Sequence, residues 1–571
     1  METGEVMSGG SKLRSQQWFR KSTSSFGHRS RMLQNGFDLE EFVDRPVIGI
    51  INTWSGLSTC HGHLREIAEV VSRGVLQAGG FPVELPVMSL PEMLTKPTAM
   101  FYRNLLAMEV EELLKSHPID GVVLLGGCDK TTPALLMAAA SADLPSIYVP
   151  AGYMLHGLWR GQRLGSGVDA WTYGPKLKMG EIDLEQWYEI EQGSARTVGT
   201  CNTMGTASTM TAVAEALGMT LPMASSLPAV DAGLRRLARE AGTRIVAMVE
   251  EELTPSQVMT SAAFRNAATV NFALGGSTNA AIHLLAMAGR LKGVALDLKT
   301  LDSIARTVPV IANILPSGTW LMEDFYEAGG LPALMSTLGE RLDLSCRTVS
   351  GRSLGDQLAG VPVHNAEVIR PLANPIGQSA FATLYGNLAP NGCVIKPSAA
   401  SPQLLRHRGR AVVFDGYDDL KSRINDPELD VDDDGVLVLR NAGPLGGPGM
   451  PEWGMLPIPK KLLAKGVRDM VRISDARMSG TSFGTVVLHV SPESHLGGPL
   501  AIVRTGDMIE LDVPARSISL CVSPEEIVDR LAAWSPPAHM PARGYETLFA
   551  QHVTQAHEGC DFKFMRADGE A

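Results

Sequence analysis

Three of the seven cysteines lie in loop-like runs of small, hydroxylated or charged residues. Cys60 ends the run STC, Cys128 is central in GGCDK, and Cys201 is central in GTCNT. Three thiolates would leave one iron of an iron–sulfur cluster open to a substrate oxygen, which suits Lewis-acid chemistry. Their separations of 68 and 73 residues exceed those of common cluster motifs, so spacing alone favours three buried thiols. The remaining cysteines lie in less distinctive surroundings and are expected to be inert thiols: Cys346, Cys393, Cys521 and Cys560.

Three carboxylates are candidate ligands for a hard cation, which prefers oxygen donors. Glu92, Asp129 and Glu452 lie in segments bounded by Gly or Pro, which we expect to be loops. Taken singly, each is more typical of a solvated surface side chain. Asp129 directly follows Cys128, so a cation bound there would lie beside the thiol.

Glycine- and hydroxyl-rich runs give weaker indications. The run GGSTN at 275–279 and the run GPLGGPG at 443–449 fit neither the dinucleotide fingerprint nor the P-loop, so nucleotide binding has little support. Their glycines are more typical of tight turns or of a backbone that approaches a ligand. The run SDARMSGTSFG at 474–484 lacks the Gly-x-Ser-x-Gly elbow of a hydrolase and predicts a polar loop of unassigned purpose.

The elements around these residues repeat a strand–loop–helix order. An apolar run at 47–51 predicts a buried strand, the loop to Cys60 follows, and apolar residues at helical spacing occupy 64–75. The same order returns with a strand at 121–125 and a helix at 133–140. This alternation predicts a parallel sheet covered by helices on both faces, with ligands gathered outside the carboxyl ends of its strands.

The length of 571 residues exceeds what one hydrophobic core supports, so we predict at least two domains. After about residue 370 the texture changes to short β-rich runs between Gly, Pro and Asp turns, at 411–414, 436–439, 509–513 and 518–522. The predicted fold is α/β, with an N-terminal domain whose parallel sheet is flanked by helices and a smaller, mainly β, barrel-like C-terminal domain. We assign 1–44 to an N-terminal arm, 45–370 to the α/β domain that carries the three cysteines, and 371–571 to the β-rich domain that carries Glu452 and the hydroxyl-rich loop.

Composition restricts the partners of the chain. A net charge of −11 and a pI near 5.7 provide no basic field for nucleic acid. No apolar run reaches the length of a membrane span, and the charged first 31 residues do not resemble a signal peptide, so we expect a cytoplasmic protein without a membrane partner. An odd number of widely spaced cysteines does not resemble a disulfide framework.

Five runs together resemble the signature blocks of the dihydroxyacid dehydratase and phosphogluconate dehydratase superfamily, in that family's order and across nearly the whole chain. They occupy 126–140, 201–210, 275–283, 386–398 and 474–484. The runs LRSQ at 13–16, KPTAM at 96–100 and RNL at 103–105 are similar to the sugar-acid branch, which includes L-arabinonate and D-xylonate dehydratases. Where relatives often have Gly-Gly-Pro-Met, this chain has AGYM at 151–154, and we expect the bulky Tyr153 to alter the substrate pocket.

The resemblance implies a set of ligands and roles. It implies a [2Fe-2S] cluster on Cys60, Cys128 and Cys201, and a Mg²⁺ ion surrounded by Glu92, Asp129, Glu452 and a carbamylated Lys130. Carbamylation would turn the lysine into an anionic oxygen ligand. The resemblance also makes Ser479 the base, and we assign Thr481 as a helper that protonates the leaving hydroxide. Further candidates for contact with substrate hydroxyls or carboxylate, for which a structural role is equally well supported, are Arg163, Ser166, Asn279, His283 and Lys396.

The implied reaction removes the C2 proton and the C3 hydroxyl of a sugar acid, most simply a pentonate, and yields a 2-keto-3-deoxy acid. A serine hydroxyl is a weak base, so Ser479 would act as an alkoxide stabilised by the nearby cation. Mg²⁺ would stabilise the enediolate-like charge and the cluster would act as Lewis acid on the 3-hydroxyl. Relatives form dimers or tetramers, so we expect a homodimer or homotetramer.

Two alternatives stay open at this point. A dihydroxyacid dehydratase of branched-chain amino-acid synthesis shares the chemistry but needs an apolar pocket for an alkyl group. A non-catalytic binding protein stabilised by zinc would use the cysteines as structural ligands.

Overall fold

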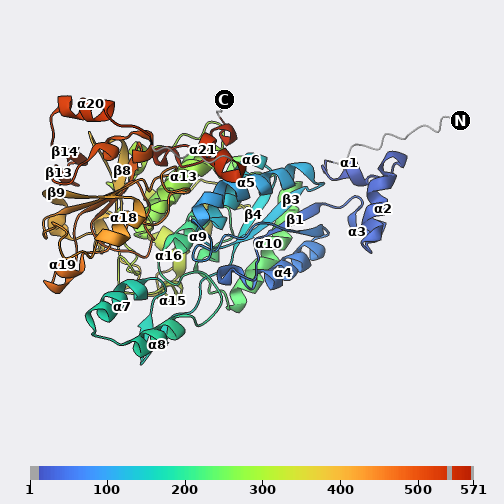
Figure 1. Ribbon diagram of the computed structural model, residues 1–571. Helices are drawn as coiled ribbons and strands as arrows, with labels where there is room; N and C mark the ends of the chain where they lie inside the picture. Colours follow the sequence, from blue (N-terminus) through green and yellow to red (C-terminus); the bar gives the residue numbers. More distant parts are fainter. Residues whose placement is uncertain (1–11, 537–542, 568–571) are drawn as a thin grey trace.

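The structure is a computed structural model that describes residues 12–536 and 543–567. Residues 1–11 of the predicted arm, and 537–542 and 568–571 of the predicted C-terminal domain, lie outside this range. Figure 1 shows a helix-rich N-terminal part, drawn in blue to green, beside a barrel drawn in orange to red. The first described helices lie at the outer end of the N-terminal part: α1 (Gln16–Phe19), α2 (Phe26–Gln34) and α3 (Leu39–Phe42).

The N-terminal part is built on a four-stranded sheet with the order β2-β1-β3-β4, and all its strands are parallel. The strands are β1 (Val47–Asn52), β2 (Phe81–Pro86), β3 (Gly121–Gly126) and β4 (Ser146–Pro150). Strands β1, β3 and β4 are buried along their whole length, as expected of parallel strands covered on both faces. Helices lie on both faces of this sheet (Figure 1): α4 (Leu64–Gln77) and α10 (Ala232–Glu250) on one, α5 (Ala99–Ser116) and α6 (Thr131–Ala142) on the other.

Helices α4 and α10 pack in close backbone contact because each has a glycine at the crossing. A Cβ at Gly74 would lie 2.0 Å from the carbonyl oxygen of Arg239, and one at Gly242 would lie 2.2 Å from that of Val71. Both distances are far below van der Waals contact. The two glycines therefore set how closely α10 covers α4.

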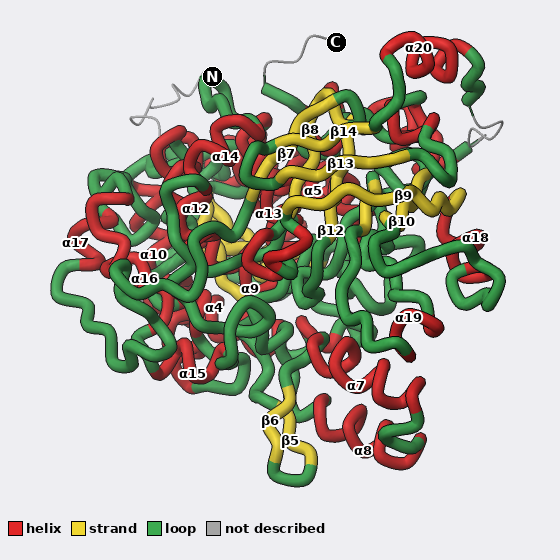
Figure 2. The backbone as a smooth tube through the Cα atoms, turned by 90° about the vertical axis from the view of Figure 1, so that its left-hand side faces the viewer, coloured by secondary structure: helices red, strands yellow, loops and turns green. Residues whose placement is uncertain are grey.

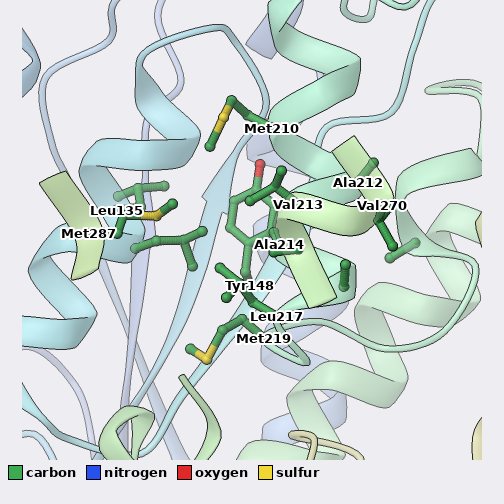
Figure 3. Close-up of a cluster of buried hydrophobic side chains, with 14 of the residues drawn as sticks. Leu135, Tyr148, Met210, Ala212, Val213, Ala214, Leu217, Met219, Val270 and Met287 are labelled. Atoms are coloured by element: carbon green, nitrogen blue, oxygen red, sulfur yellow. The ribbon is translucent and has the colours of Figure 1, made fainter. Parts of the chain in front are cut away.

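Three buried helices, α9 (Thr206–Ala216), α12 (Ser261–Ala273) and α13 (Asn279–Gly289), form the core between the sheet and the barrel. Figure 3 shows Tyr148 of β4 surrounded by apolar side chains that include Met210, Val213 and Met219. The Tyr148 hydroxyl donates to the carbonyl oxygen of Gly126 at 2.8 Å, which ties β4 to the loop that holds Cys128.

The remaining N-terminal elements surround this core. Figure 2 shows that a hairpin and two helices project from the body as a lobe: β5 (Gly157–Trp159), β6 (Gln162–Leu164), α7 (Val168–Met179) and α8 (Leu184–Ser194). The others are α11 (Pro255–Val258), α14 (Leu298–Ala305), α15 (Met322–Glu327), α16 (Gly330–Leu338) and α17 (Leu354–Leu358).

The C-terminal part is a closed eight-stranded barrel with the order β10-β11-β12-β8-β7-β14-β13-β9. Its strands are β7 (Ala382–Gly386), β8 (Ala389–Ile395), β9 (Arg406–Asp415), β10 (Val436–Arg440), β11 (Arg472–Ser474), β12 (Val486–Ser491), β13 (Met508–Asp512) and β14 (Ser517–Leu520). The helices of this part are α18 (Gly416–Arg423), α19 (Lys460–Ala464), α20 (Pro524–Ala532) and α21 (Gly544–His552). The predicted combination of a helix-flanked parallel sheet and a barrel-like β part is confirmed. Within the described ranges, no helix combines the length and apolarity of a membrane span.

Candidate active site

The strand ends of the parallel sheet place the first group of candidate residues together. Cys60 follows β1, Glu92 follows β2, and the run Cys128–Asp129–Lys130 joins β3 to α6. Adjacent parallel strands end at one edge of the sheet, so these loops converge there, as the sequence predicted for the loops of Cys60 and Cys128.

Lys130 lies at the centre of three carboxylates. Its fully buried Nζ lies 3.2 Å from Glu92 Oε2, 3.2 Å from Asp129 Oδ2 and 3.8 Å from Glu452 Oε1. Glu452 comes from the segment between β10 and α19, more than 300 residues after Glu92 in the chain. The ammonium therefore occupies the point on which carboxylates from both parts of the molecule converge.

The charges of this cluster shift one another's proton affinities. Burial would raise the pKa of Glu92, but the cations Lys130 and Arg477 hold it below its usual value. Burial, together with the neighbouring Glu92 and Asp129, raises the pKa of Glu452. Burial opposes charge on Lys130, yet Asp129 and Glu92 keep its pKa above the usual value. The cluster is therefore a site that strongly favours a cation.

Arg477 joins the two parts of this cluster, and the sequence offered no signal for it beyond its place in the hydroxyl-rich run. Its buried guanidinium donates to Glu452 Oε1 at 3.0 Å, to the carbonyl oxygen of Met450 at 2.8 Å and to Thr98 Oγ1 at 3.2 Å. Thr98 donates in turn to Glu92 Oε1 at 3.0 Å. Arg477 thus fixes the orientation of Glu452 directly and that of Glu92 through Thr98.

The three cysteines of the distinctive runs are neighbours in space. The thiols of Cys60 and Cys128 are hydrogen-bonded, and this bond, burial and the nearby Cys128 and Cys201 raise the pKa of Cys60 well above its usual value. Burial raises the pKa of Cys201 to about 12, and Asp129 and Cys128 add to the effect. The raised pKa values of Cys60 and Cys201 mean that positive charge is needed to hold these two residues as thiolates.

Two polar residues orient the cysteine loops. His61 Nε2 accepts a hydrogen bond from the backbone N–H of Cys128 at 3.0 Å, and burial lowers the pKa of His61 to about 4. The Ser166 side chain is hydrogen-bonded to Cys201, and its backbone N–H donates to Asn202 Oδ1 at 2.8 Å. Of these two, sequence reasoning named Ser166 and missed His61, although His61 directly follows Cys60.

The hydroxyl-rich run forms a tight loop between β11 and β12 that carries Ser479. Ser479 Oγ lies 2.9 Å from Thr481 Oγ1, close enough to share a proton. A Cβ at Gly480 would lie 2.7 Å from the backbone nitrogen of Thr206, so the loop packs directly on the start of α9. A Cβ at Gly167 would lie 2.9 Å from Thr481 Oγ1, which places the segment after Ser166 against this loop.

Asn279, at the start of α13, connects the serine loop to the carboxylates. Its Nδ2 donates to Glu452 Oε1 at 2.9 Å and to the carbonyl oxygen of Met478 at 3.1 Å. His283 follows one turn later on the same helix and is fully buried. Both residues are therefore brought to the predicted site.

The two other substrate-contact candidates have different surroundings. Arg163 lies on β6, its side chain is 39 % exposed, and it pairs with Asp324 of α15 at 2.9 Å, so it is tied to α15. Lys396 follows β8 and is buried, and within the described residues its Nζ has no hydrogen-bond partner. Ala399, three residues later, accepts a hydrogen bond from the N–H of Gly484 at 2.7 Å, which places this segment beside the end of the serine loop.

Tyr153 is bridged through its backbone to Thr200, the neighbour of Cys201. Its side chain is buried, and the groups that act electrostatically on its hydroxyl include Glu323 and Tyr326 of α15. Tyr153 therefore places its backbone beside the cysteine loop and its hydroxyl toward α15.

The glycine-rich run at 443–449 supports Glu452. A Cβ at Gly449 would lie 2.5 Å from the backbone of Phe101 in α5, and Glu493 accepts hydrogen bonds from Leu445 and Gly446 at 2.9 Å. These glycines let the backbone of the run pack closely against the rest of the protein, and Glu452 follows the run three residues later.

The donor set fits the implied cofactors in type. Within the described ranges, no three His, Cys, Asp or Glu side chains alone form a ready metal-binding group. What the site presents is three carboxylates around a lysine nitrogen, with Glu92 Oε2 buried 3.2 Å from that nitrogen. Oxygen donors that surround a cation suit Mg²⁺, and the neighbouring thiols suit iron.

The chain belongs to the dihydroxy-acid/6-phosphogluconate dehydratase family. The N-terminal family model matches residues 45–357 and the C-terminal model matches residues 367–560. The protein is accordingly a dehydratase, a carbon–oxygen hydro-lyase.

Relatives named for sugar acids and relatives named for dihydroxy acids differ in their identity to the chain. The chain is 54 % identical over 565 residues to 6-deoxy-6-sulfo-D-gluconate dehydratase of Pseudomonas putida, with 98 % of this chain and 97 % of the relative covered. It is 52 % identical over 559 residues to L-arabinonate dehydratase of Rhizobium leguminosarum bv. trifolii (97 % and 96 % covered). Identity to dihydroxy-acid dehydratase of Caldanaerobacter subterraneus is 38 % over 553 residues (95 % and 98 % covered).

Proposed function

We propose that this enzyme dehydrates a sugar acid to the corresponding 2-keto-3-deoxy acid. The main structural support for this proposal is a path of hydrogen bonds. It runs from the serine loop through Asn279 to Glu452, and so to the carboxylate cluster around Lys130. The higher identity to enzymes named for sugar acids than to those named for dihydroxy acids supports the substrate class.

In the proposed reaction the substrate loses its C2 proton and its C3 hydroxyl as water, and the resulting enol tautomerises to the ketone. Ser479 Oγ, as an alkoxide, accepts the C2 proton. Thr481 Oγ1, 2.9 Å away, passes a proton to the departing hydroxide and regains one from Ser479, which restores the alkoxide. Asn279 holds the backbone of the serine loop through Met478, and Arg477 holds Glu452. Because a serine hydroxyl is a weak base, Ser479 must lose its own proton before it can accept the C2 proton of the substrate.

We propose that Cys60, Cys128 and Cys201 hold a [2Fe-2S] cluster, and that Glu92, Asp129, Glu452 and a carbamylated Lys130 hold Mg²⁺. When bound, these groups would supply Lewis acidity toward the carboxylate, the 2-hydroxyl and the leaving 3-hydroxyl. The net charge of the cluster supports the lysine modification. Carbamylation turns the buried ammonium into an anion and so lowers the charge of the cluster by two, and a bound divalent cation raises it by two. The buried cluster therefore keeps the net charge that it has with the unmodified lysine.

The test is a substrate panel on anaerobically purified enzyme, read out as 2-keto-3-deoxy product. The panel holds L-arabinonate, D-xylonate, 6-deoxy-6-sulfo-D-gluconate and 2,3-dihydroxyisovalerate. We expect turnover of a sugar acid, with a pentonate the first candidate, and a kcat/KM for the branched-chain acid at least about 100-fold lower, because hydrogen-bonding groups of the pocket would lose their partners. Preference for 2,3-dihydroxyisovalerate would contradict the proposal.

A further inference from the structure

Arg103 of α5 is a completely buried cation whose hydrogen bonds go to neutral groups. Its Nη2 donates to the carbonyl oxygens of Gly559 and Cys560 at 2.9 and 2.8 Å, and to Asn104 Oδ1 at 2.8 Å. Its Nη1 lies 3.1 Å from His283 Nδ1. Burial lowers the pKa of Arg103 to about 10, which leaves it charged at neutral pH. This arginine thus connects the C-terminal segment to the helix that carries His283.

The contact with Arg103 determines which nitrogen of His283 carries the proton. A guanidinium offers only donors, so Nδ1 of His283 must accept. The imidazole is neutral, because burial and the charges of Arg103 and Arg477 lower its pKa well below the usual value. A neutral ring with an accepting Nδ1 carries its proton on Nε2. His283 therefore presents an Nε2–H donor.

That donor is buried and has no partner in the described part of the chain. His283 lies one helical turn after Asn279 on α13, and residues four apart share one face of a helix. The Asn279 carboxamide on this face contacts Glu452 and the serine loop, and the charges of Lys130 and Arg477 act on His283. A buried N–H without a partner costs free energy unless an acceptor enters the site.

We propose that Arg103 is a positioning residue that fixes the Nε2–H tautomer of His283, so that His283 donates a hydrogen bond to an oxygen of the bound sugar acid. The inference rests on the proposed function for the identity of the acceptor, while the tautomer follows from the protein alone. Arg103 itself lies behind the imidazole and contacts no substrate. Through Gly559 and Cys560, the same guanidinium makes the C-terminal segment part of the support of the site.

The tautomer is tested by ¹⁵N NMR of enzyme labelled at histidine, with the His283 signals assigned by their loss in His283→Gln. In the native enzyme and in Arg103→Lys, which keeps a donor to Nδ1, we expect Nε2 protonated and Nδ1 unprotonated. In Arg103→Met the proton is expected to redistribute to Nδ1. An Nδ1–H tautomer in the native enzyme, or an unchanged tautomer in Arg103→Met, overturns the proposal.

A double-mutant cycle distinguishes a positioning role of Arg103 from a role in supporting the fold. The kcat/KM of each variant is measured with the sugar acid that the panel shows to be turned over fastest. Arg103→Met is expected to lower kcat/KM by about 10- to 100-fold, the effect of one lost hydrogen bond to a charged or reacting group. Glutamine at 283 places an amide N–H near the position of Nε2 and has no tautomer to fix. Adding Arg103→Met to His283→Gln should therefore cost less than about threefold. Equal losses in both backgrounds would show that Arg103 acts only on the fold, and would overturn the proposal. If no sugar acid is turned over, the proposed function fails, and the NMR result still decides the tautomer.

Discussion

Replacing Lys396 by methionine should make the enzyme more stable and less active at the same time. The Lys396 side chain is 2 % exposed, and among the described residues its Nζ has no hydrogen-bond partner. Burial alone lowers its pKa to about 7. A buried amine without a counter-charge destabilises the fold, and Lys396 lies beside the serine loop, so we expect it to bind an anion brought by the substrate.

The magnitude follows from the pKa. A fall from 10.5 to about 7 corresponds to about 5 kcal/mol of destabilisation. At about 2.1 cal/mol/K per residue, one cooperative transition of the whole chain has an unfolding entropy of about 1.2 kcal/mol/K, so Lys396→Met should raise the unfolding temperature by about 4 °C. The unfolded lysine binds its proton more tightly than the folded one between pH 7 and 10.5, so the penalty is complete below about pH 7 and shrinks as the pH rises. At pH 9 the gain should be about 2 °C.

The assay is scanning unfolding of the holoenzyme at pH 6.5 and pH 9, at one protein concentration and scan rate. Lys465→Met, at an exposed lysine, is the matched control and should shift the unfolding temperature by less than about 1 °C at either pH. The kcat/KM of Lys396→Met for the preferred sugar acid should fall at least about tenfold. A gain that is the same at both pH values, or a loss of stability, would refute the argument from burial, and full activity would remove Lys396 from the site.

Three further substitutions test the site and the fold. Cys128→Ser should abolish turnover and bleach the visible colour of the enzyme; an active, coloured variant would rule out Cys128 as a cluster ligand. Ser479→Ala should leave the visible absorption spectrum unchanged and remove turnover, whereas retained turnover would eliminate Ser479 as the base. Gly74→Ala should lower the unfolding free energy by about 1 to 3 kcal/mol, because its Cβ would lie 2.0 Å from the carbonyl oxygen of Arg239, and unchanged thermal unfolding would show that α4 and α10 can separate without cost.

Local apolar patterns predicted two of the four strands of the sheet, and the helices that follow them. The strand predicted at 47–51 is β1 (Val47–Asn52), and the helix predicted at 133–140 is the interior of α6 (Thr131–Ala142). The placement of Cys60 and Cys128 at strand ends also followed, because parallel strands place their carboxyl ends at one edge. Glu92 and Glu452 were named as candidate ligands from their loop context, but only the resemblance joined them in one site and assigned a role to Ser479, since no local rule joins the barrel loops to the sheet.

The residues that sequence reasoning missed have their partners far away in the chain. Arg477 is a single arginine in a polar run until the fold places Glu452 and Thr98 around it. Arg103 was missed for the same reason, because its partners Gly559 and Cys560 lie more than 450 residues later in the chain. Such contacts leave no spacing pattern, and an alignment that pairs distant positions would be the signal to look for.

The free-energy cost of burying each charge of the site depends on the groups around it. Lys130, Arg477 and Arg103 are all removed from water, and a structure retains so many buried cations only where anions or polar groups offset the cost. Glu92, Asp129 and Glu452 offset Lys130 and Arg477, and main-chain carbonyls offset Arg103. Lys396 has no such partner among the described residues, and neither does the Nε2–H of His283. A carboxylate with adjacent hydroxyls would supply an anion to the first and an acceptor to the second, so we expect a bound sugar acid to satisfy both groups.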